Sequence, residues 1–183
     1  MILLLSIVAG LLAGLLTGGS FKWVKQHSLR GLALPIAAFL VKTLAATFFP
    51  PQKGAIPVCI TQYALLFTFF LLNYKQFIWP ILGFLGSLGN FLVILLNGGC
   101  MPVSAELFGT MPDRLLLLEK NGIYAYCRID ANTRLGFLGD ILRIGPSGLP
   151  LGFASIGDVV LSAGIAVLCF LLVKQPHTSC SRE

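Results

Sequence analysis

Four polar side chains stand inside long apolar stretches of this sequence, and their types could do chemistry there. They are one ammonium, two carboxamides and one carboxylate: Lys42, Gln62, Asn90 and Asp158. Ionisable groups inside a membrane are expensive to bury, so they indicate a functional site by default. Charge and hydrogen bonds from these four groups could hold a polar ligand.

Each of the four also has a structural explanation. The Lys42 ammonium can reach the membrane surface along its own aliphatic stem. Gln62 and Asn90 can hydrogen-bond to neighbouring helices, a contact worth about 0.6 kcal/mol on average. Asp158 completes a Ser-x-x-acid capping pattern that starts at Ser155, which places its carboxylate in the first turn of a helix. Both interpretations remain open from the sequence.

The composition indicates a membrane protein. The chain has 183 residues, of which 56% are hydrophobic and 11% charged, whereas soluble domains carry roughly 25% charged residues. Five apolar runs have about the length that crosses a bilayer, residues 1–17, 31–49, 57–73, 78–96 and 156–173. The predicted fold is an all-α integral membrane protein, a single domain over residues 1–183 with five transmembrane helices.

Residues 97–155, named here the lid segment, separate the fourth and fifth runs. The segment is too rich in glycine and proline to be a span. The connection between the second and third runs must lie on the same side as the lid segment. Counted from that side, the four polar residues lie within roughly 10 Å of one surface. We therefore expect them to form a polar pocket under the lid segment, with Asn97 at its edge as a further ligand-binding residue.

Basic residues near the span ends predict the orientation. With the N-terminus outside, the inner connections carry Lys22, Lys25, Arg30, Lys75, Lys174 and Arg182, and the outer ones carry Lys53, Arg114 and Arg143. The inner excess favours an N-terminus outside and a C-terminus in the cytoplasm, in a multi-pass protein of the plasma membrane whose partner is the lipid bilayer. The basic residues form no patch, which argues against nucleic-acid binding.

Asp140 lies in the lid segment outside any capping pattern. With Asp158 it is a candidate catalytic carboxylate, as general acid or base. An Asx turn, or an ion pair with Arg134 or Arg143, would explain it structurally. The sequence has no phosphate-binding glycine loop, no zinc spacing and no nucleophile elbow, so we expect no metal and no cofactor.

Two cysteines of the lid segment, Cys100 and Cys127, are a candidate disulfide if their side of the membrane is oxidising. Two unlinked thiols are the alternative.

Small residues fall four apart on one face of the first apolar run: Ser6, Gly10, Gly14 and Gly18. Such a stripe lets another helix approach closely, so it is a possible site for a helix partner. A general abundance of glycine in apolar spans would explain it equally well.

Three polar motifs carry a resemblance that extends over nearly the whole chain. They are Asn97-Gly98-Gly99-x-Met101-Pro102-Val103, Thr133-Arg134-Leu135-x-Phe137-Leu138-Gly139-Asp140 and Ser155-Ile156-Gly157-Asp158-Val159. With the apolar N-terminus, they resemble an uncharacterised family of small bacterial integral membrane proteins, a domain of unknown function. The resemblance implies a bacterial inner-membrane protein and no assigned activity. Cys100 fills a position where the family pattern is loose.

Three functions fit these observations. The first is a binding or transport-related membrane protein with its ligand in the polar pocket, which would not be an enzyme. The second is a membrane-embedded enzyme that acts on a lipid or lipid-linked substrate through Asp140 and Asp158. The third is a structural subunit that packs against a partner through the Ser6 to Gly18 stripe.

Overall fold

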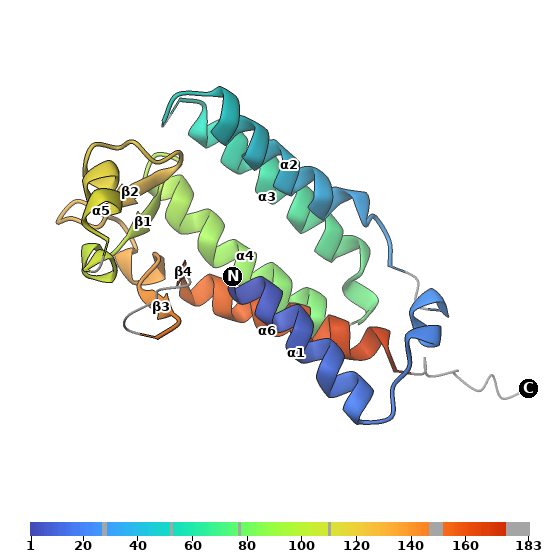
Figure 1. Cartoon of the computed structure of the whole chain (residues 1–183). Helices are drawn as coiled ribbons and strands as arrows, with labels where there is room; N and C mark the ends of the chain where they lie inside the picture. Colours follow the sequence, from blue (N-terminus) through green and yellow to red (C-terminus); the bar gives the residue numbers. More distant parts are fainter. Residues whose placement is uncertain (27–28, 52, 77, 110, 147–151, 175–183) are drawn as a thin grey trace, which may run out of the picture.

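The computed structural model describes residues 1–26, 29–51, 53–76, 78–109, 111–146 and 152–174. Five apolar helices form a bundle: α1 (Ile2–Leu16), α2 (Ala33–Phe48), α3 (Ala55–Leu72), α4 (Ile78–Leu96) and α6 (Ile156–Leu172). The chain joins them through η1 (Phe21–Gln26) and η2 (Tyr74–Gln76), two short 3-10 helices at one end of the bundle. An apolar helix therefore lies at each of the five predicted positions (Figure 1).

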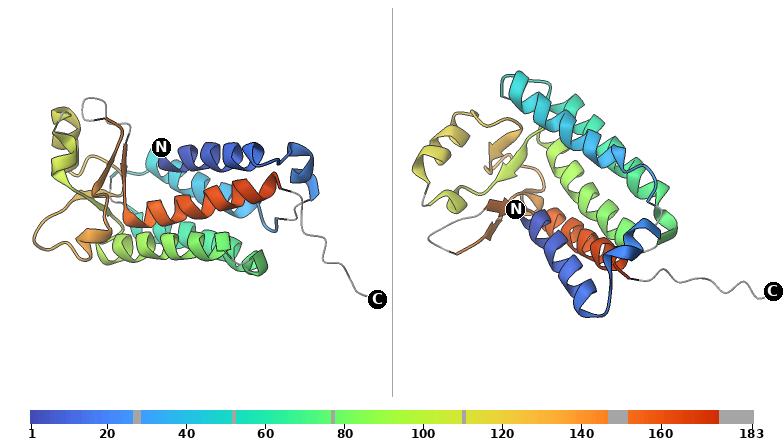
Figure 2. Two further views of the ribbon diagram at one scale, coloured as in Figure 1. Left: turned by 90° about the horizontal axis from the view of Figure 1, so that it is seen from below. Right: turned by 45° about the vertical axis from the view of Figure 1, so that its right-hand side comes forward.

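The helices pack as an open series rather than as a closed ring. α2 packs on α3, α3 on α4, α4 on α6 and α6 on α1. α1 and α2 stand at the two ends of this series, and Figures 1 and 2 show the α2–α3 pair leaning away from α1. One side of the bundle is consequently left without a helix across it.

Two of the five helices are long and apolar enough to cross a membrane by themselves, α3 with 18 residues and α4 with 19. The other three, α1, α2 and α6, have 15, 16 and 17 residues. At 1.5 Å per residue, the five helices, α3 and α4 included, have lengths from about 23 Å to about 28 Å. The described residues thus contain two candidate spans, α3 and α4, and three shorter apolar helices, α1, α2 and α6.

Small residues set the close approach of α6 to its two neighbours. A Cβ at Gly157 would lie 2.2 Å from the side-chain oxygen of Asn90 and 2.7 Å from the carbonyl oxygen of Gly86, both on α4. A Cβ at Gly10 of α1 would lie 2.3 Å from the carbonyl oxygen of Ala166 on α6. Only glycine fits at these two crossings.

The small-residue stripe of α1 contacts α6 of the same chain. Gly10 and Gly14 are buried there, whereas Gly18 has open space around it and the Ser6 hydroxyl donates to the carbonyl of Leu3. The close helix neighbour of this stripe is thus internal.

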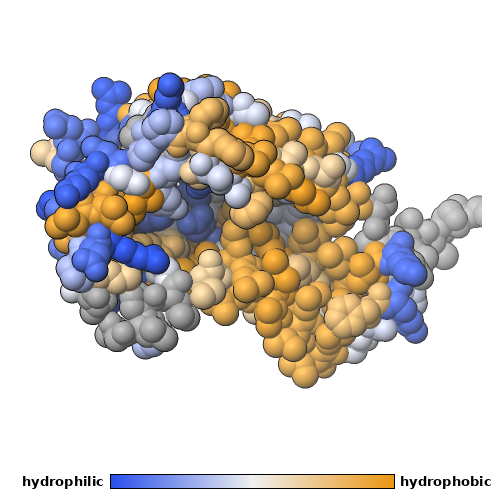
Figure 3. Space-filling model, turned by 45° about the horizontal axis from the view of Figure 1, so that its top comes forward, coloured by the Kyte–Doolittle hydropathy of each residue, from blue (hydrophilic) through white to orange (hydrophobic). Residues whose placement is uncertain are grey.

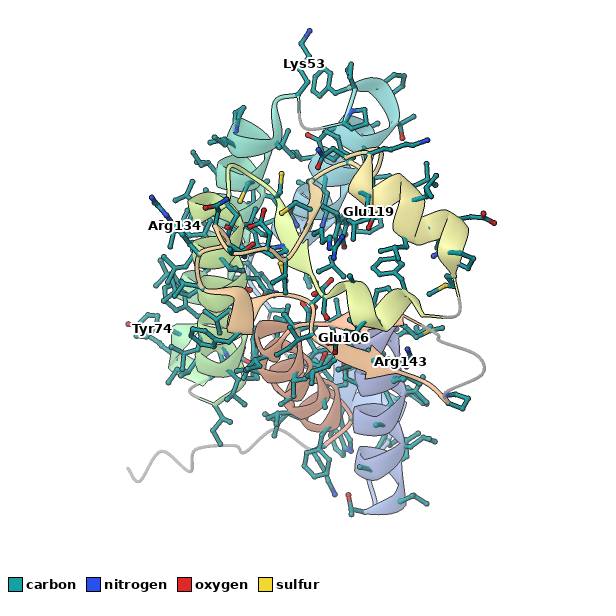
Figure 4. The ribbon with its side chains drawn as sticks, turned by 90° about the vertical axis from the view of Figure 1, so that its left-hand side faces the viewer. Lys53, Tyr74, Glu106, Glu119, Arg134 and Arg143 are labelled. Carbon is teal, nitrogen blue, oxygen red and sulfur yellow. The ribbon has the colours of Figure 1, made fainter. Side chains whose placement is uncertain are left out.

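The lid segment covers one end of the bundle (Figure 1). It contains β1 (Met101–Val103) paired in parallel with β2 (Tyr126–Arg128), and β3 (Leu142–Ile144) paired antiparallel with β4 (Gly152–Ala154). Its helical parts are η3 (Ala105–Phe108), α5 (Pro112–Glu119) and η4 (Gly136–Leu138). Figure 4 looks onto this end, where Glu106, Glu119, Arg134 and Arg143 all belong to the lid segment and Lys53 stands at the turn between α2 and α3.

The predicted all-α class is therefore wrong for the lid segment. Tyr126-Cys127-Arg128 pairs with Met101-Pro102-Val103 in register, and this pairing joins residues far apart in the sequence. Each strand has only three residues, so neither shows the alternation that predicts a strand. Leu135 and Leu138 of the lid segment pack against the buried cluster of Cys59, Tyr63, Val93, Ile94 and Met101, which fixes the lid segment to the bundle.

Candidate functional site

The open side of the bundle contains a cavity of about 750 Å³, named here the bundle cavity. Side chains of α1, α2, α3, α4 and α6 line it. The four polar residues predicted to gather under the lid segment all lie on its wall: Lys42, Gln62, Asn90 and Asp158. Figure 3 shows a hollow between apolar surfaces, with hydrophilic residues at its bottom.

Asn90 and Asp158 are joined to each other across α4 and α6. The Asn90 amide Nδ2 donates to Asp158 Oδ1 at 2.7 Å, and the Ser155 hydroxyl donates to Asn90 Oδ1 at 2.7 Å. A capping box completes the group, because the backbone N–H of Asp158 donates to Ser155 Oγ at 2.8 Å and that of Ser155 donates to Asp158 Oδ2 at 3.2 Å. Both Asp158 oxygens therefore already accept hydrogen bonds.

This network holds the start of α6 against α4. Ser155 is fully buried and Asn90 nearly so, and each buried polar atom of the network has a partner, as a stable buried network requires. Asp158 thus caps α6, and Asn90 hydrogen-bonds to the neighbouring helix, as the structural explanation of these two residues predicted. Asp158 also remains a carboxylate on the wall of the bundle cavity.

Lys42 has a different environment. Its ammonium nitrogen lies 5.6 Å from the centre of the Tyr126 ring of the lid segment, which is the distance of a cation–π contact. Among the residues that the structure describes, the one salt bridge is Arg128 with Glu119, on the exposed surface of the lid segment. The charge of Lys42, on the wall of the bundle cavity, has no carboxylate in direct contact to neutralise it.

The bundle cavity is polar at the lid end and apolar at the other. Phe69, Phe70, Trp79 and Leu168 line its far end. Between the two ends, the hydroxyl of Ser87 is fully buried and has no hydrogen-bond partner among the described residues. An unsatisfied buried hydroxyl costs roughly 1–3 kcal/mol, so a group that enters the cavity and bonds to Ser87 would gain that energy.

Asn97 lies outside the bundle cavity. Its amide Nδ2 donates to the carbonyls of Val93 at 2.7 Å and Arg134 at 2.8 Å, and its oxygen accepts from the backbone N–H of Arg134 at 3.0 Å. These bonds tie the end of α4 to the lid segment. The structure therefore gives Asn97 a connecting position rather than one on the cavity wall.

Asp140 is buried, with 6% of its surface exposed. It lines a second cavity of about 270 Å³ inside the lid segment, named here the lid cavity, together with Tyr126. The pKa of Asp140 is raised to about 7, first by burial and then by the negative charge of Asp158, while the Lys42 ammonium opposes both. Among the described residues, no salt bridge joins Asp140 to Arg134 or Arg143, and its Oδ1 has no hydrogen-bond partner.

Cys100 and Cys127 lie side by side in the lid segment as thiols. The residue after Cys100 begins β1, and Cys127 is in the middle of the paired strand β2. The hydrogen bond between the two thiols lowers the pKa of Cys100. Proximity thus satisfies the first requirement of the predicted disulfide.

Sequence reasoning missed Tyr126 and Ser87. Tyr126 reaches Lys42 only because β2 pairs with β1, and the preceding residue, Ala125, has a φ of 56° that non-glycine residues seldom adopt. Ser87 lies among apolar and small residues of α4, where a hydroxyl ordinarily bonds its own helix. No spacing in the sequence indicates either contact.

Within the described residues, no group of three or more histidine, cysteine, aspartate or glutamate side chains could hold a metal ion.

Comparison with known proteins gives a family and no activity. No curated protein and no solved structure matches the chain. The model of a family of unknown function, DUF5317, matches residues 20–170, and these include the bundle cavity's four polar residues and the whole lid segment. The chain belongs to this family, DUF5317.

Proposed function

We propose that this protein is a multi-pass membrane protein that binds an amphiphilic small molecule in the bundle cavity. The observation that carries the proposal is the cavity itself, about 750 Å³ in volume, with a polar end at Lys42, Gln62 and Asp158 and an apolar end at Trp79 and Phe70. A ligand with a polar head and an apolar body matches this division. Its head would lie under the lid segment and its body between the helices.

The outer surface of the helices supports a membrane location for all five. Large apolar side chains are exposed along α1 and α2, among them Leu4 at 61%, Ile36 at 61% and Phe39 at 69%. Soluble monomers rarely expose apolar patches of this extent. A bilayer can thin locally to match helices of about 23 Å, so α1, α2 and α6 can cross with α3 and α4.

Charge supports an orientation with the lid segment outside. All described acidic residues lie in the lid segment or at the adjoining start of α6: Glu106, Asp113, Glu119, Asp130, Asp140 and Asp158. The opposite end of the bundle carries basic residues without an acidic one among the described residues: Lys22, Lys25, Arg30, Lys75 and Lys174. Near the span ends the lid side carries fewer basic residues, Lys53, Arg114 and Arg143. Because basic residues near span ends favour the cytoplasmic side, we place the N-terminus outside and the C-terminus inside.

The route into the bundle cavity is from the side. Since α1 and α2 do not close the series of helices, a molecule dissolved in the bilayer can reach Lys42 without crossing the lid segment. Lys42 provides a positive charge that no carboxylate of the described residues contacts. We infer that the ligand carries a negatively charged group next to its apolar part.

Fluorescence of Trp79 tests this proposal. The chain has two tryptophans, and Trp79 is 2% exposed at the apolar end of the bundle cavity. In a Trp23→Phe protein reconstituted in bilayers, we expect phospholipids with brominated acyl chains to quench Trp79 at low mole fraction. Lys42→Gln should raise the mole fraction needed about tenfold, for the loss of one charge-assisted contact.

Lys53→Gln is the matched control, because Lys53 is exposed at the α2–α3 turn and does not line the cavity. The proposal would be overturned if quenching rose in simple proportion to the brominated fraction, and equally in the Trp23→Phe protein and in its Lys42→Gln and Lys53→Gln variants. Ordinary contact with the surrounding lipid gives that result.

One observation favours an enzyme as the second candidate. Asp140 is a buried carboxyl whose pKa lies near neutrality, and the charge of Asp158 contributes to that shift. Such pairs are typical of general acid–base sites. The two residues line different cavities, which argues against a shared reacting atom. Mass spectrometry of lipids incubated with the purified protein distinguishes the two functions, because only an enzyme would generate a new lipid species.

A further inference from the structure

The lid cavity is a second space that the proposed function does not use. It measures about 270 Å³ and shares no lining residue with the bundle cavity. Its wall combines one carboxyl, Asp140, with three aromatic rings, Phe108, Tyr126 and Phe153. The rings of Phe108 and Phe153 lie 4.8 Å apart between centres. Aromatic faces and a carboxylate are the groups that attract an organic cation.

Asp140 is held so that one of its side-chain oxygens remains unsatisfied. Its backbone N–H donates to the carbonyl of Pro102 at 2.8 Å, and its carbonyl accepts from the backbone N–H of Ser104 at 3.1 Å. These bonds fix the residue beside β1. Oδ1 of Asp140 is buried and accepts no hydrogen bond from any described residue. A buried acceptor without a donor is costly, and a ligand with N–H donors would remove that cost.

Tyr126 lies at the border of the two cavities. It lines the lid cavity, and its ring contacts the ammonium of Lys42, which lines the bundle cavity. The groups therefore follow one another along the molecule: the apolar end of the bundle cavity, the Lys42 ammonium, the Tyr126 ring and the Asp140 carboxyl. Among the described residues of the lid cavity wall, the basic residue is Arg114, which is exposed, so water and salt screen its charge.

This order matches the chemistry of one class of membrane lipid. In a phospholipid with a primary amine in its head group, the acyl chains are followed by a phosphate and the phosphate by an ammonium. We propose that the amphiphile of the bundle cavity is such an aminophospholipid, with its phosphate at Lys42 and its ammonium bound by Asp140 between the aromatic rings of the lid cavity. This inference rests on the proposed function and adds the identity of the head group.

Lipid retention measures the head-group preference. The protein is reconstituted in bilayers of equal parts phosphatidylethanolamine, phosphatidylcholine and phosphatidylglycerol, then extracted in mild detergent, and the retained lipid is identified by mass spectrometry. We expect phosphatidylethanolamine to exceed each of the other two about tenfold, because only its head group offers ammonium N–H donors to Asp140.

Two variants separate the head-group assignment from the proposed function. Asp140→Asn should retain phospholipid but lose the preference for phosphatidylethanolamine, whereas Lys42→Gln should retain less of all three. Glu119→Gln is the matched control, since Glu119 also lies in the lid segment but lines neither cavity. Equal retention of the three lipids by the wild type would overturn the inference and leave the proposed function standing; retention of no lipid would overturn both.

A lipid series keeps the inference testable if Asp140→Asn fails to fold. Successive N-methylation of phosphatidylethanolamine removes its N–H donors one by one and keeps the positive charge. Retention by the wild-type protein should fall at each step and reach the level of phosphatidylcholine. A flat series would show that Asp140 does not hydrogen-bond to the ammonium, and the assignment would then be wrong.

Discussion

The α4–α6 interface and the border between α2 and the lid segment differ in how their polar groups are satisfied. At the interface, Asn90, Ser155 and Asp158 bond to one another, and both carboxylate oxygens accept hydrogen bonds. At the border, the ammonium of Lys42 contacts an aromatic ring and Oδ1 of Asp140 accepts nothing from the described residues. Complete satisfaction is typical of a scaffold, while unsatisfied buried groups indicate a place where a ligand binds.

The largest difference in stability between the two regions should follow from oxidation of the thiols of the lid segment. Oxidation of Cys100 and Cys127 would close a loop that includes α5, and the chain-entropy model gives about 3 kcal/mol of added stability for a loop of this size. We expect a mild thiol oxidant such as diamide to form this disulfide and to slow hydrogen exchange in the lid segment, with the α4–α6 interface unchanged.

Peptide mapping after oxidation checks this prediction, with Cys127→Ser as the control that cannot close the loop. The disulfide would be refuted if the map contained both thiols unlinked under conditions that oxidise other exposed thiols.

The next effect concerns the α4–α6 interface. Asn90→Ala removes the amide N–H that donates to Asp158 and the amide oxygen that accepts from the Ser155 hydroxyl. It should therefore lower the free energy of unfolding by about 2 kcal/mol. Ser87→Ala, on the same helix, removes a hydroxyl that has no hydrogen-bond partner in the part of the chain that the structure describes, and it should leave stability unchanged or slightly higher. Denaturant titration in detergent micelles measures both, and equal losses in the two variants would contradict the comparison.

The smallest effect is the pH dependence that Asp140 contributes. Its pKa of about 7 in the folded protein exceeds the ordinary value of 3.8, so the folded state binds more protons between these values. Stability therefore falls as the pH rises through this window.

Thermal unfolding at pH 5 and pH 8 tests this dependence. Asp140→Asn should show a smaller decrease than the wild type, and Asp130→Asn, altered at an exposed carboxylate of the lid segment, should behave as the wild type does. An equal decrease in all three proteins would show that other groups carry the pH dependence.

Hydropathy was sufficient to place the helices. The five predicted runs and the five apolar helices differ by at most two residues at either end, because a long apolar run that folds as a helix makes its backbone hydrogen bonds within itself. The lid segment was harder to predict. Its three-residue strands pair with partners that no local pattern identifies, and its glycines and prolines indicated only that it could not be a span.

For the polar residues, too, the sequence predicted one property and packing decided another. Their common depth followed from the sequence, because the rise of a helix is fixed at 1.5 Å per residue and converts position along the chain into height. Lys42, Gln62, Asn90 and Asp158 accordingly line one cavity. The direction in which each side chain points depends on how the helices are rotated against one another, and only packing sets that rotation.

Tertiary structure therefore decided which of these residues are satisfied. The close crossing at Gly157 brings Asn90 onto Asp158, whereas the pairing of β1 with β2 brings Tyr126 over Lys42. The sequence alone determined that an apolar bundle carries a polar layer beneath a lid segment. Only the contacts between distant segments separated that layer into a satisfied scaffold and an unsatisfied site, because hydrogen bonds and cation–π contacts depend on distances that chain spacing does not fix.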